Sequence, residues 1–188
     1  MTTRIVVGGP PGSGKSTFVA SFKRALLDIG VRADYVELDL YAPTLPLIEG
    51  RMTPEQRIKS KRKDIPDEEI QRAARRLVEL DERFDVVLGD LPGMMTPQTK
   101  ILCKHATLAI IVCKDEKIEE MDAWQQFFKE LGIVVVSRIV SKLSGSEIIK
   151  VTGENVIEAV LIGLDREVRV SDTLTRLAFQ LMAILNLH

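Results

Sequence analysis

The residues most suited to chemistry in this chain form a glycine-rich loop near its start. Positions 9–16 read Gly-Pro-Pro-Gly-Ser-Gly-Lys-Ser, which is the spacing G-x-x-x-x-G-K-[ST] of a Walker A phosphate-binding loop. An apolar run at 5–7 precedes it as a buried strand would, and 16–29 follows as a helix. In that setting backbone N–H groups and a helix N-terminus face phosphate oxygens. The sequence therefore predicts a phosphate site here, not an ordinary Gly/Pro turn.

Individual positions of this loop, called the phosphate loop below, have separate expected tasks. Lys15 should reach the β- and γ-phosphates of a nucleotide, and Ser16 should place its hydroxyl on Mg²⁺. Gly12 and Gly14 allow backbone angles and a close approach that side chains would block. The residues predicted to bind the nucleotide here are Gly9, Pro10, Pro11, Gly12, Ser13, Gly14, Lys15, Ser16 and Thr17.

A second acidic element follows the apolar segment 84–89. Asp90 comes at the expected carboxyl end of a buried strand, and Leu-Pro-Gly follows it. An anion at this place is what a Walker B position needs to hold Mg²⁺, directly or through water. The N–H of Gly93 is then expected to sense the γ-phosphate. A plain strand-ending turn uses the same residue types, so this interpretation depends on the phosphate loop.

Two further carboxylates, Glu37 and Asp39, end the second predicted strand. They are two positions apart and so share one face of the strand end. Ligands of open α/β sheets bind beyond the carboxyl ends of the strands. Either carboxylate could therefore polarise an attacking water or bind Mg²⁺ through water. The alternative for each is a solvated strand end.

The elements that must position these residues alternate along the chain. Strands are expected at 4–8, 34–40, 84–89, 107–113, 133–140 and 167–170. Helices are expected at 16–29, 67–80, 97–105, 118–131 and 155–162, with a last one capped by Ser171 or Asp172. Continuously apolar strands separated by helices indicate a mostly parallel sheet with helices on both faces, a three-layer α/β P-loop fold. No linker divides the 188 residues, so one nucleotide-binding domain over 1–188 is predicted.

Composition favours a soluble cytoplasmic protein. The net charge is −1 and 45% of residues are hydrophobic, which does not suit a generally basic nucleic-acid binder. The longest apolar runs are far shorter than the ~20 residues that span a bilayer, so no membrane partner is expected. Cys103 and Cys113 form no Cys-x-x-Cys pair and are interpreted as reduced buried thiols, with a metal site shared between subunits left open.

Three segments carry a family resemblance. Segment 38–50 begins Leu-Asp-Leu-Tyr-Ala-Pro-Thr-Leu-Pro and resembles the Asp-x-Asp-x-Tyr-Gly-Pro-Ser-x-Pro segment of the Mrp/MinD branch of SIMIBI-class P-loop ATPases. Asp-Leu-Pro-Gly at 90–93 is similar to that branch's Asp-x-Pro-Pro-Gly, and 118–142 resembles its helix–strand pair after the fourth strand. With the phosphate loop, the resemblance covers most of the chain.

This resemblance implies ATP binding and hydrolysis, a nucleotide-dependent dimer, and service as a switch or carrier-assembly factor. It puts Lys15, Asp39 and Asp90 at catalytic positions: phosphate contact, water activation and Walker B. It puts Ser16, Asp39 and Asp90 at the metal. Pro10, however, stands where the family carries an extra lysine that reaches across the dimer, so that mechanism and a tight homodimer are in question. Iron–sulfur carriers of the branch use a Cys-x-x-Cys pair, and without one no cluster is predicted.

A basic segment at 51–63 has six Lys or Arg residues against one acid before Asp64. It has no aromatic side chain to stack on bases, so a nucleic-acid partner is not supported. One interpretation is a solvated helix and loop. The others are a surface that docks a protein partner, or a lid whose Arg57 or Arg62 stabilises charge on a transferring phosphoryl group.

The segment 140–144, at the end of the fifth predicted strand, is where related topologies meet the base, so Lys142 is predicted to contact it. The aspartate that would complete a guanine reader is missing, which favours ATP over GTP. Three functions remain open. The first is a Mg²⁺-dependent ATPase acting as a switch or assembly factor. The second is a small-molecule kinase in which Asp39 accepts a substrate proton. The third is a regulatory subunit that binds nucleotide without hydrolysing it.

Overall fold

A computed structural model describes residues 2–80, 82–152, 156–164 and 167–186. Its seven strands form one sheet in the order β2-β3-β1-β4-β5-β7-β6 within the described residues. The strands are β1 (Thr3–Gly8), β2 (Ala33–Glu37), β3 (Val86–Asp90), β4 (Leu108–Lys114), β5 (Val134–Lys142), β6 (Ile148–Val151) and β7 (Ile157–Ile162). The helices are α1 (Lys15–Asp28), α2 (Leu45–Ile48), α3 (Pro54–Ser60), α4 (Asp67–Glu79), α5 (Pro97–Leu102), α6 (Glu120–Glu130) and α7 (Asp172–Ile184), with a short 3₁₀ turn at Asp115–Lys117.

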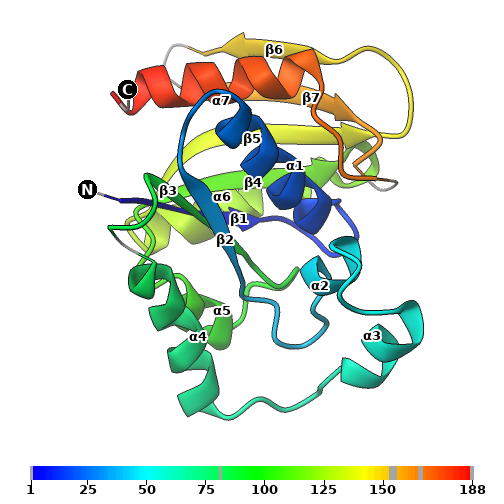
Figure 1. Cartoon of the computed structure of the whole chain (residues 1–188), viewed down its shortest axis with the longest axis vertical. Coiled ribbons are helices and arrows are strands. Elements are labelled where there is room, and N and C mark those ends of the chain that lie inside the picture. The colour runs from blue at the N-terminus through cyan, green and yellow to red at the C-terminus, as the bar shows by residue number, and fades with distance from the viewer. Residues whose placement is uncertain (1, 81, 153–155, 165–166, 187–188) are drawn as a thin grey trace.

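Helices cover both faces of this sheet (Figure 1). On one face α1 and α7 pack through buried side chains such as Phe18, Phe22 and Leu177. On the other face α4, α5 and α6 pack through Leu77 and Trp124, among others. Every strand pair is parallel except β6 with β7. The predicted three-layer, mostly parallel α/β fold is confirmed, because strands covered on both faces need the continuous apolar runs that the sequence contains.

The register brings the chemically interesting residues to one edge of the sheet. Val7, two residues before the phosphate loop, lies opposite Asp90 in the β1–β3 ladder. Glu37 lies opposite the same Asp90 in the β2–β3 ladder. The carboxyl ends of three neighbouring strands therefore meet where α1 begins, which is the place where open α/β sheets bind ligands.

Two predictions near the C-terminus are wrong. The predicted helix 155–162 contains β7 instead, which runs parallel to β5; residue 155 itself lies outside the described residues. Ile157, Ala159 and Leu161 are buried and alternate with less buried neighbours, which is the two-residue period of a strand. Residues 167–170, predicted as a strand, form no regular element, and the antiparallel edge strand β6 was not predicted.

Among the described residues, no helix is long and apolar enough to cross a membrane. Cys103 and Cys113 are both buried and free, as predicted. Burial raises the pKa of the Cys103 thiol to about 12 and that of the Cys113 thiol to about 11. Both thiols are therefore neutral near neutral pH and behave as small apolar core side chains.

Candidate phosphate-binding site

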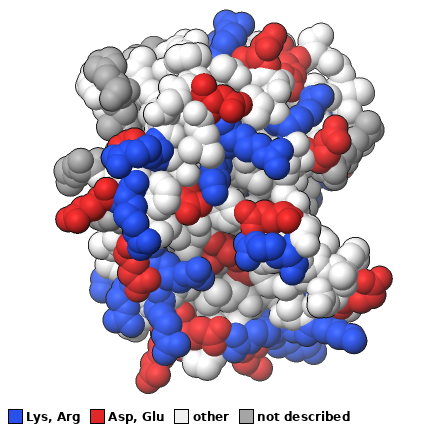
Figure 2. All heavy atoms as spheres, viewed as in Figure 1, with Lys and Arg blue, Asp and Glu red and all other residues white. Residues whose placement is uncertain are grey.

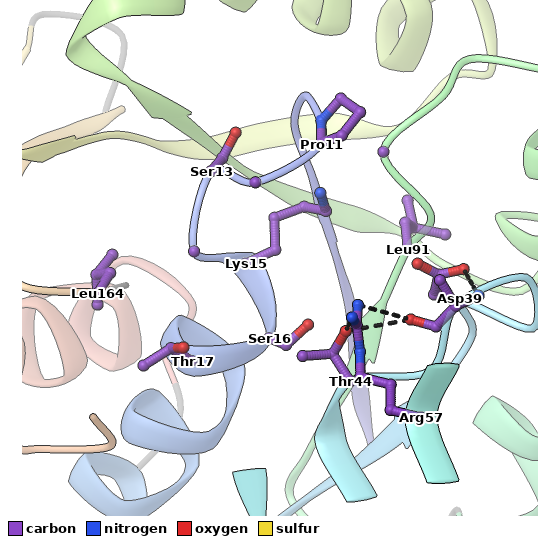
Figure 3. Close-up of a pocket in the computed structure, with 14 residues that line it drawn as sticks. Pro11, Ser13, Lys15, Ser16, Thr17, Asp39, Thr44, Arg57, Leu91 and Leu164 are labelled. Carbon is purple, nitrogen blue, oxygen red and sulfur yellow. Dashed lines mark hydrogen bonds between the residues drawn. The ribbon is translucent and has the colours of Figure 1, made fainter. Parts of the chain in front are cut away.

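An open cavity of about 390 Å³ lies at the carboxyl ends of the central strands (Figure 3). One wall is the phosphate loop and the start of α1. The opposite wall is the segment after β2 together with α3. The residues that line this phosphate cavity are Pro11, Gly12, Ser13, Gly14, Lys15, Ser16, Thr17, Asp39, Ala42, Thr44, Arg57, Leu91, Gly93 and Leu164.

The phosphate loop depends on glycine at its last turn. Gly14 has a φ of 85°, a left-handed conformation, and it is the N-cap of α1. A Cβ at Gly14 would lie 2.8 Å from the Cβ of Leu164. The positive φ angle and the close contact with Leu164 therefore both exclude a side chain at Gly14. The free N–H groups at the start of α1 are presented to the cavity.

Lys15 folds back over the phosphate loop. Its Nζ donates hydrogen bonds to the carbonyl oxygens of Gly9 at 3.0 Å and Pro10 at 3.1 Å. Burial lowers the pKa of Lys15, and the charges of Asp90 and Asp39 act against that shift. A phosphate oxygen would supply a stronger, charged acceptor for this ammonium group than the two carbonyls do.

Asp90 is a buried carboxylate without hydrogen-bond partners. Neither of its side-chain oxygens meets a donor with good geometry among the described residues. Burial raises the pKa of Asp90 to about 7, although the Ser16 hydroxyl and the charge of Lys15 act to lower it. A buried anion that the protein leaves unsatisfied is costly unless a ligand completes its surroundings.

The chemistry of this donor set fits Mg²⁺. The described part of the chain has no group of three or more His, Cys, Asp or Glu side chains that could hold a metal by themselves. Mg²⁺ is commonly bound by one or two carboxylates, with phosphate oxygens and water as its other ligands. Asp90 beside the hydroxyl of Ser16 matches that requirement.

Glu37 and Asp39 have different surroundings, which their spacing did not reveal. The Glu37 carboxylate accepts hydrogen bonds from the backbone N–H groups of Asp39 at 3.1 Å, Thr44 at 2.9 Å and Leu45 at 2.9 Å. Burial and the charge of Asp90 raise the pKa of Glu37 to about 8. Glu37 therefore fixes the loop that follows β2, and the earlier alternative of a solvated strand end does not describe it.

Asp39 is the carboxylate of this pair that lines the phosphate cavity. One of its oxygens accepts hydrogen bonds from the N–H groups of Tyr41 at 3.1 Å and Ala42 at 3.0 Å. Figure 3 shows Asp39 across the cavity from the phosphate loop. The bonds to the backbone hold the side chain in place, which suits a group that orients a water or a metal-bound water.

Gly93 brings the loop after β3 against the phosphate loop. A Cβ at Gly93 would lie 2.7 Å from the backbone nitrogen of Pro11 and 2.8 Å from its Cα. Both atoms belong to the backbone and cannot swing away, so only glycine allows this contact. Gly93 lines the cavity. The contact of its N–H with a γ-phosphate stays a prediction.

Most predicted site residues are brought together. Residues 11–17, Asp39 and Gly93 line the cavity, Gly9 and Pro10 provide the carbonyls behind it, and Asp90 is buried beside it. Lys142 is elsewhere. It forms an ion pair with Asp115 at 3.1 Å in a separate hollow at the ends of β4 and β5. Its contact with the base stays a prediction.

The structure adds lining residues that were not predicted. Ala42 and Thr44 lie within the segment that carries the family resemblance, so a signal for them existed. Leu164 follows β7, and the wrong helix prediction there concealed it. The two arginines that were candidates for a lid lie in different places. Arg57 lines the phosphate cavity, whereas Arg62 does not line it and forms an ion pair with Glu69.

The sheet order and the site together define a P-loop NTPase fold of the MinD-like type. No protein-family model and no curated protein sequence matches the chain. Solved structures do match. MinD from Pyrococcus horikoshii, solved with Mg-ADP, is 18% identical with a TM-score of 0.60, over 78% of this chain and 72% of that one. MinD from Pyrococcus furiosus is 19% identical with a TM-score of 0.58, over 78% and 74%.

A third similar structure belongs to a biosynthetic enzyme. Cobyrinic acid a,c-diamide synthase from Mycobacterium smegmatis, solved with an ATP analogue and magnesium, is 18% identical with a TM-score of 0.57. The match covers 77% of each chain. At these identities the likeness shows the fold, and it confirms the MinD-like P-loop architecture that the motifs predicted.

Proposed function

We propose that this chain binds Mg-ATP, hydrolyses it, and uses the reaction as a nucleotide-driven switch or assembly step. The observation that carries the proposal is the Asp90 carboxylate, buried without a partner beside a complete phosphate loop. The similar structures of MinD and cobyrinic acid a,c-diamide synthase, solved with magnesium and ADP or an ATP analogue, support the choice of ligand.

Residues of both cavity walls would hold the ligands. Backbone N–H groups of the phosphate loop and the Lys15 ammonium would bind the β- and γ-phosphates. Ser16 and Asp90, with Asp39 acting through water, would hold Mg²⁺. The metal, when bound, neutralises charge on the phosphate oxygens. Gly93 would donate its N–H to the γ-phosphate, and Lys142 would meet the base.

Hydrolysis would proceed by in-line attack. The oxygen of a water held by Asp39 forms a bond to the γ-phosphorus. The bond from that phosphorus to the β–γ bridging oxygen breaks, and its electron pair leaves with ADP. One proton of the water passes to Asp39 and on to solvent, and inorganic phosphate is released. Lys15 and the loop N–H groups stabilise the charge on the phosphate oxygens during the transfer.

The first experiment is phosphate release from Mg-ATP and Mg-GTP by the purified protein. We expect slow release from Mg-ATP. The rate should fall at least about 100-fold in Lys15→Ala, because that variant loses the buried ammonium group that would bind the phosphates. Lys100→Ala, which changes an exposed lysine on α5, is the matched control and should keep the wild-type rate. Tight binding of Mg-ATP with no release would instead indicate a regulatory subunit. Preference for Mg-GTP would overturn the base assignment.

Partners and location follow from the same proposal. We propose one domain over 1–188 that acts in the cytoplasm, where the free thiols of Cys103 and Cys113 stay reduced. The basic segment 51–63 is the proposed surface for a protein partner. In the view of Figure 2, Lys and Arg side chains are interleaved with Asp and Glu over the whole face.

One observation favours the kinase as a second candidate function. A cavity of about 380 Å³ shares Asp39 with the phosphate cavity and is also lined by Tyr35, Arg51, Arg62 and Arg76. An acceptor in this cavity would lie next to Asp39, which could accept its hydroxyl proton.

The kinase has its own test. ATP labelled at the γ-phosphate is incubated with the protein and the small-molecule fraction of a cell extract. A labelled product other than phosphate, absent with Asp39→Asn, would establish phosphoryl transfer to an acceptor. Label recovered only as inorganic phosphate would favour the ATPase.

A further inference from the structure

We infer that Arg57 is a catalytic residue that contacts the γ-phosphate from within the same chain. The inference rests on the proposed hydrolysis of a nucleoside triphosphate. It concerns the wall of the phosphate cavity that faces the phosphate loop, where neither Lys15 nor a loop N–H group supplies positive charge.

Arg57 is distinguished from its neighbours by where its side chain lies. It belongs to α3, a helix without buried residues that begins with a capping box between Thr53 and Gln56. Of the six basic side chains in 51–63, it is the one that lines the phosphate cavity. Figure 3 shows it beside Thr44, on the wall with Asp39 and across from Lys15 and Ser16.

The hydrogen bonds of Arg57 hold the guanidinium without neutralising it. Its Nη2 donates to the Thr44 hydroxyl at 2.9 Å and to the carbonyl of Ala42 at 3.5 Å. Both acceptors are neutral, and both residues line the cavity. By contrast, Arg51 and Arg62 form ion pairs with Glu49 and Glu69.

The guanidinium of Arg57 has further donors besides its Nη2. The Nε atom is buried and has no hydrogen-bond partner among the described residues. A buried N–H without an acceptor costs free energy, more so when it is charged. An anionic oxygen brought by a ligand would satisfy it, and the cavity that Arg57 lines is the one that accepts phosphates. The guanidinium is thus fixed, charged and incompletely bonded before the ligand arrives.

That state is what phosphoryl transfer requires. Negative charge spreads over the equatorial oxygens of the γ-phosphoryl group as the bond to the bridging oxygen breaks. A guanidinium already in place stabilises this charge without reorganisation. Because Arg57 and Lys15 lie on opposite walls, the group would have a cation on each side, both from one chain.

The test separates catalysis by Arg57 from a structural role. We would measure phosphate release, Mg-ADP affinity and trapping of ADP with aluminium fluoride, which imitates the transferring phosphoryl group. Arg57→Ala should lower the rate on the order of 1,000-fold, the lower end of an arginine-finger effect. It should keep the Mg-ADP dissociation constant within about threefold and lose the trapped complex. Lys59→Ala, an exposed change on the same helix, should match the wild type in all three measurements.

Two further variants complete the test. Arg57→Lys should recover part of the rate, because it restores the charge without the fork of donors. Thr44→Val removes the hydrogen bond that holds Arg57 and should lower the rate, but less than Arg57→Ala does, because the guanidinium itself is kept. If Arg57→Ala also abolished Mg-ADP binding, or still formed the trapped complex with aluminium fluoride, the inference would be overturned.

Failure of the inference and failure of the proposed function give different results. Release that depends on Lys15 but persists in Arg57→Ala would overturn the inference alone. A wild-type protein that releases no phosphate would overturn both.

Discussion

Glu37 and Asp90 lie opposite each other in the parallel ladder of β2 and β3, both at the carboxyl ends of their strands. Both acids are in one buried region, but their hydrogen bonds differ. Glu37 accepts three backbone N–H groups of the following loop, whereas Asp90 has no hydrogen-bond partner in the described chain. The first is therefore committed to structure, and the second remains available for a metal.

This pair makes the stability of the nucleotide-free protein depend on pH. The pKa of Glu37 is raised from 4.5 to about 8, and that of Asp90 from 3.8 to about 7. As pH rises from about 5 to about 8, the unfolded chain has already lost these protons while the folded chain still holds them. The free energy of unfolding therefore falls over this range. We expect a fall of about 1 kcal/mol or more, measured by urea unfolding with EDTA present.

Asp90→Asn should flatten this pH dependence and raise the stability of the nucleotide-free protein at pH 8, because no buried charge has to form there. Asp64→Asn, at an exposed position, is the control and should follow the wild type. Stability that rises between pH 5 and pH 8, or a slope unchanged in Asp90→Asn, would contradict the assignment.

Exchanging the two carboxylates of the β2 end for amides should separate structure from catalysis. Glu37→Gln weakens the acceptor of three N–H groups, and we expect a loss of about 1–3 kcal/mol in the free energy of unfolding. Asp39→Asn keeps an oxygen for Tyr41 and Ala42, so its stability should change by less than about 1 kcal/mol while phosphate release falls about 100-fold or more. Chemical unfolding and phosphate release on the same samples check both. Equal effects of the two changes on stability would contradict the division of roles.

Gly93→Ala should impair the site through contact with the phosphate loop. The added Cβ would lie 2.7 Å from the nitrogen of Pro11, and one of the two backbones must move. We expect a loss of about 1–3 kcal/mol in stability together with weaker binding of Mg-ADP, measured by calorimetry. Gly50→Ala, whose Cβ meets nothing within 4 Å but whose φ is 71°, is the control for stability loss alone. Unchanged Mg-ADP affinity in Gly93→Ala would contradict the expected displacement of the phosphate loop.

The sequence was sufficient to predict the structure wherever residues that are neighbours in the chain are also neighbours in space. The phosphate loop and α1 are contiguous, and β1 and β3 contain the continuous apolar runs 5–7 and 86–88, so these elements could be predicted. Ile157–Ile162 reads Ile-Glu-Ala-Val-Leu-Ile, which suits a helix or a strand, and only its pairing with β5 decides the matter. The fold, and not a local sequence motif, brings Arg57 and Leu164 to the phosphate cavity. The division between Glu37 and Asp39 depends on which N–H groups each accepts, which spacing does not encode.

The cis position of Arg57 predicts how inactive variants behave when mixed. Lys15→Ala removes the cation of one cavity wall and Arg57→Ala that of the other, both in the same chain. If each site needs both residues from one chain, a mixture of the two variants has no complete site at any protein concentration. We therefore expect no recovery of phosphate release on mixing, and a wild-type rate per chain that does not change with concentration.

A second chain that supplied the cation would give the opposite result. Mixed dimers would then contain one complete site, and release would recover and increase with protein concentration. Mass measurements in the same samples, with and without Mg-ATP, show whether dimers form at all. Pro10 makes the first outcome the expected one, because the phosphate loop has no lysine there to extend toward a partner. A dimer that forms without restoring activity would still agree with catalysis in one chain, whereas recovery on mixing would not.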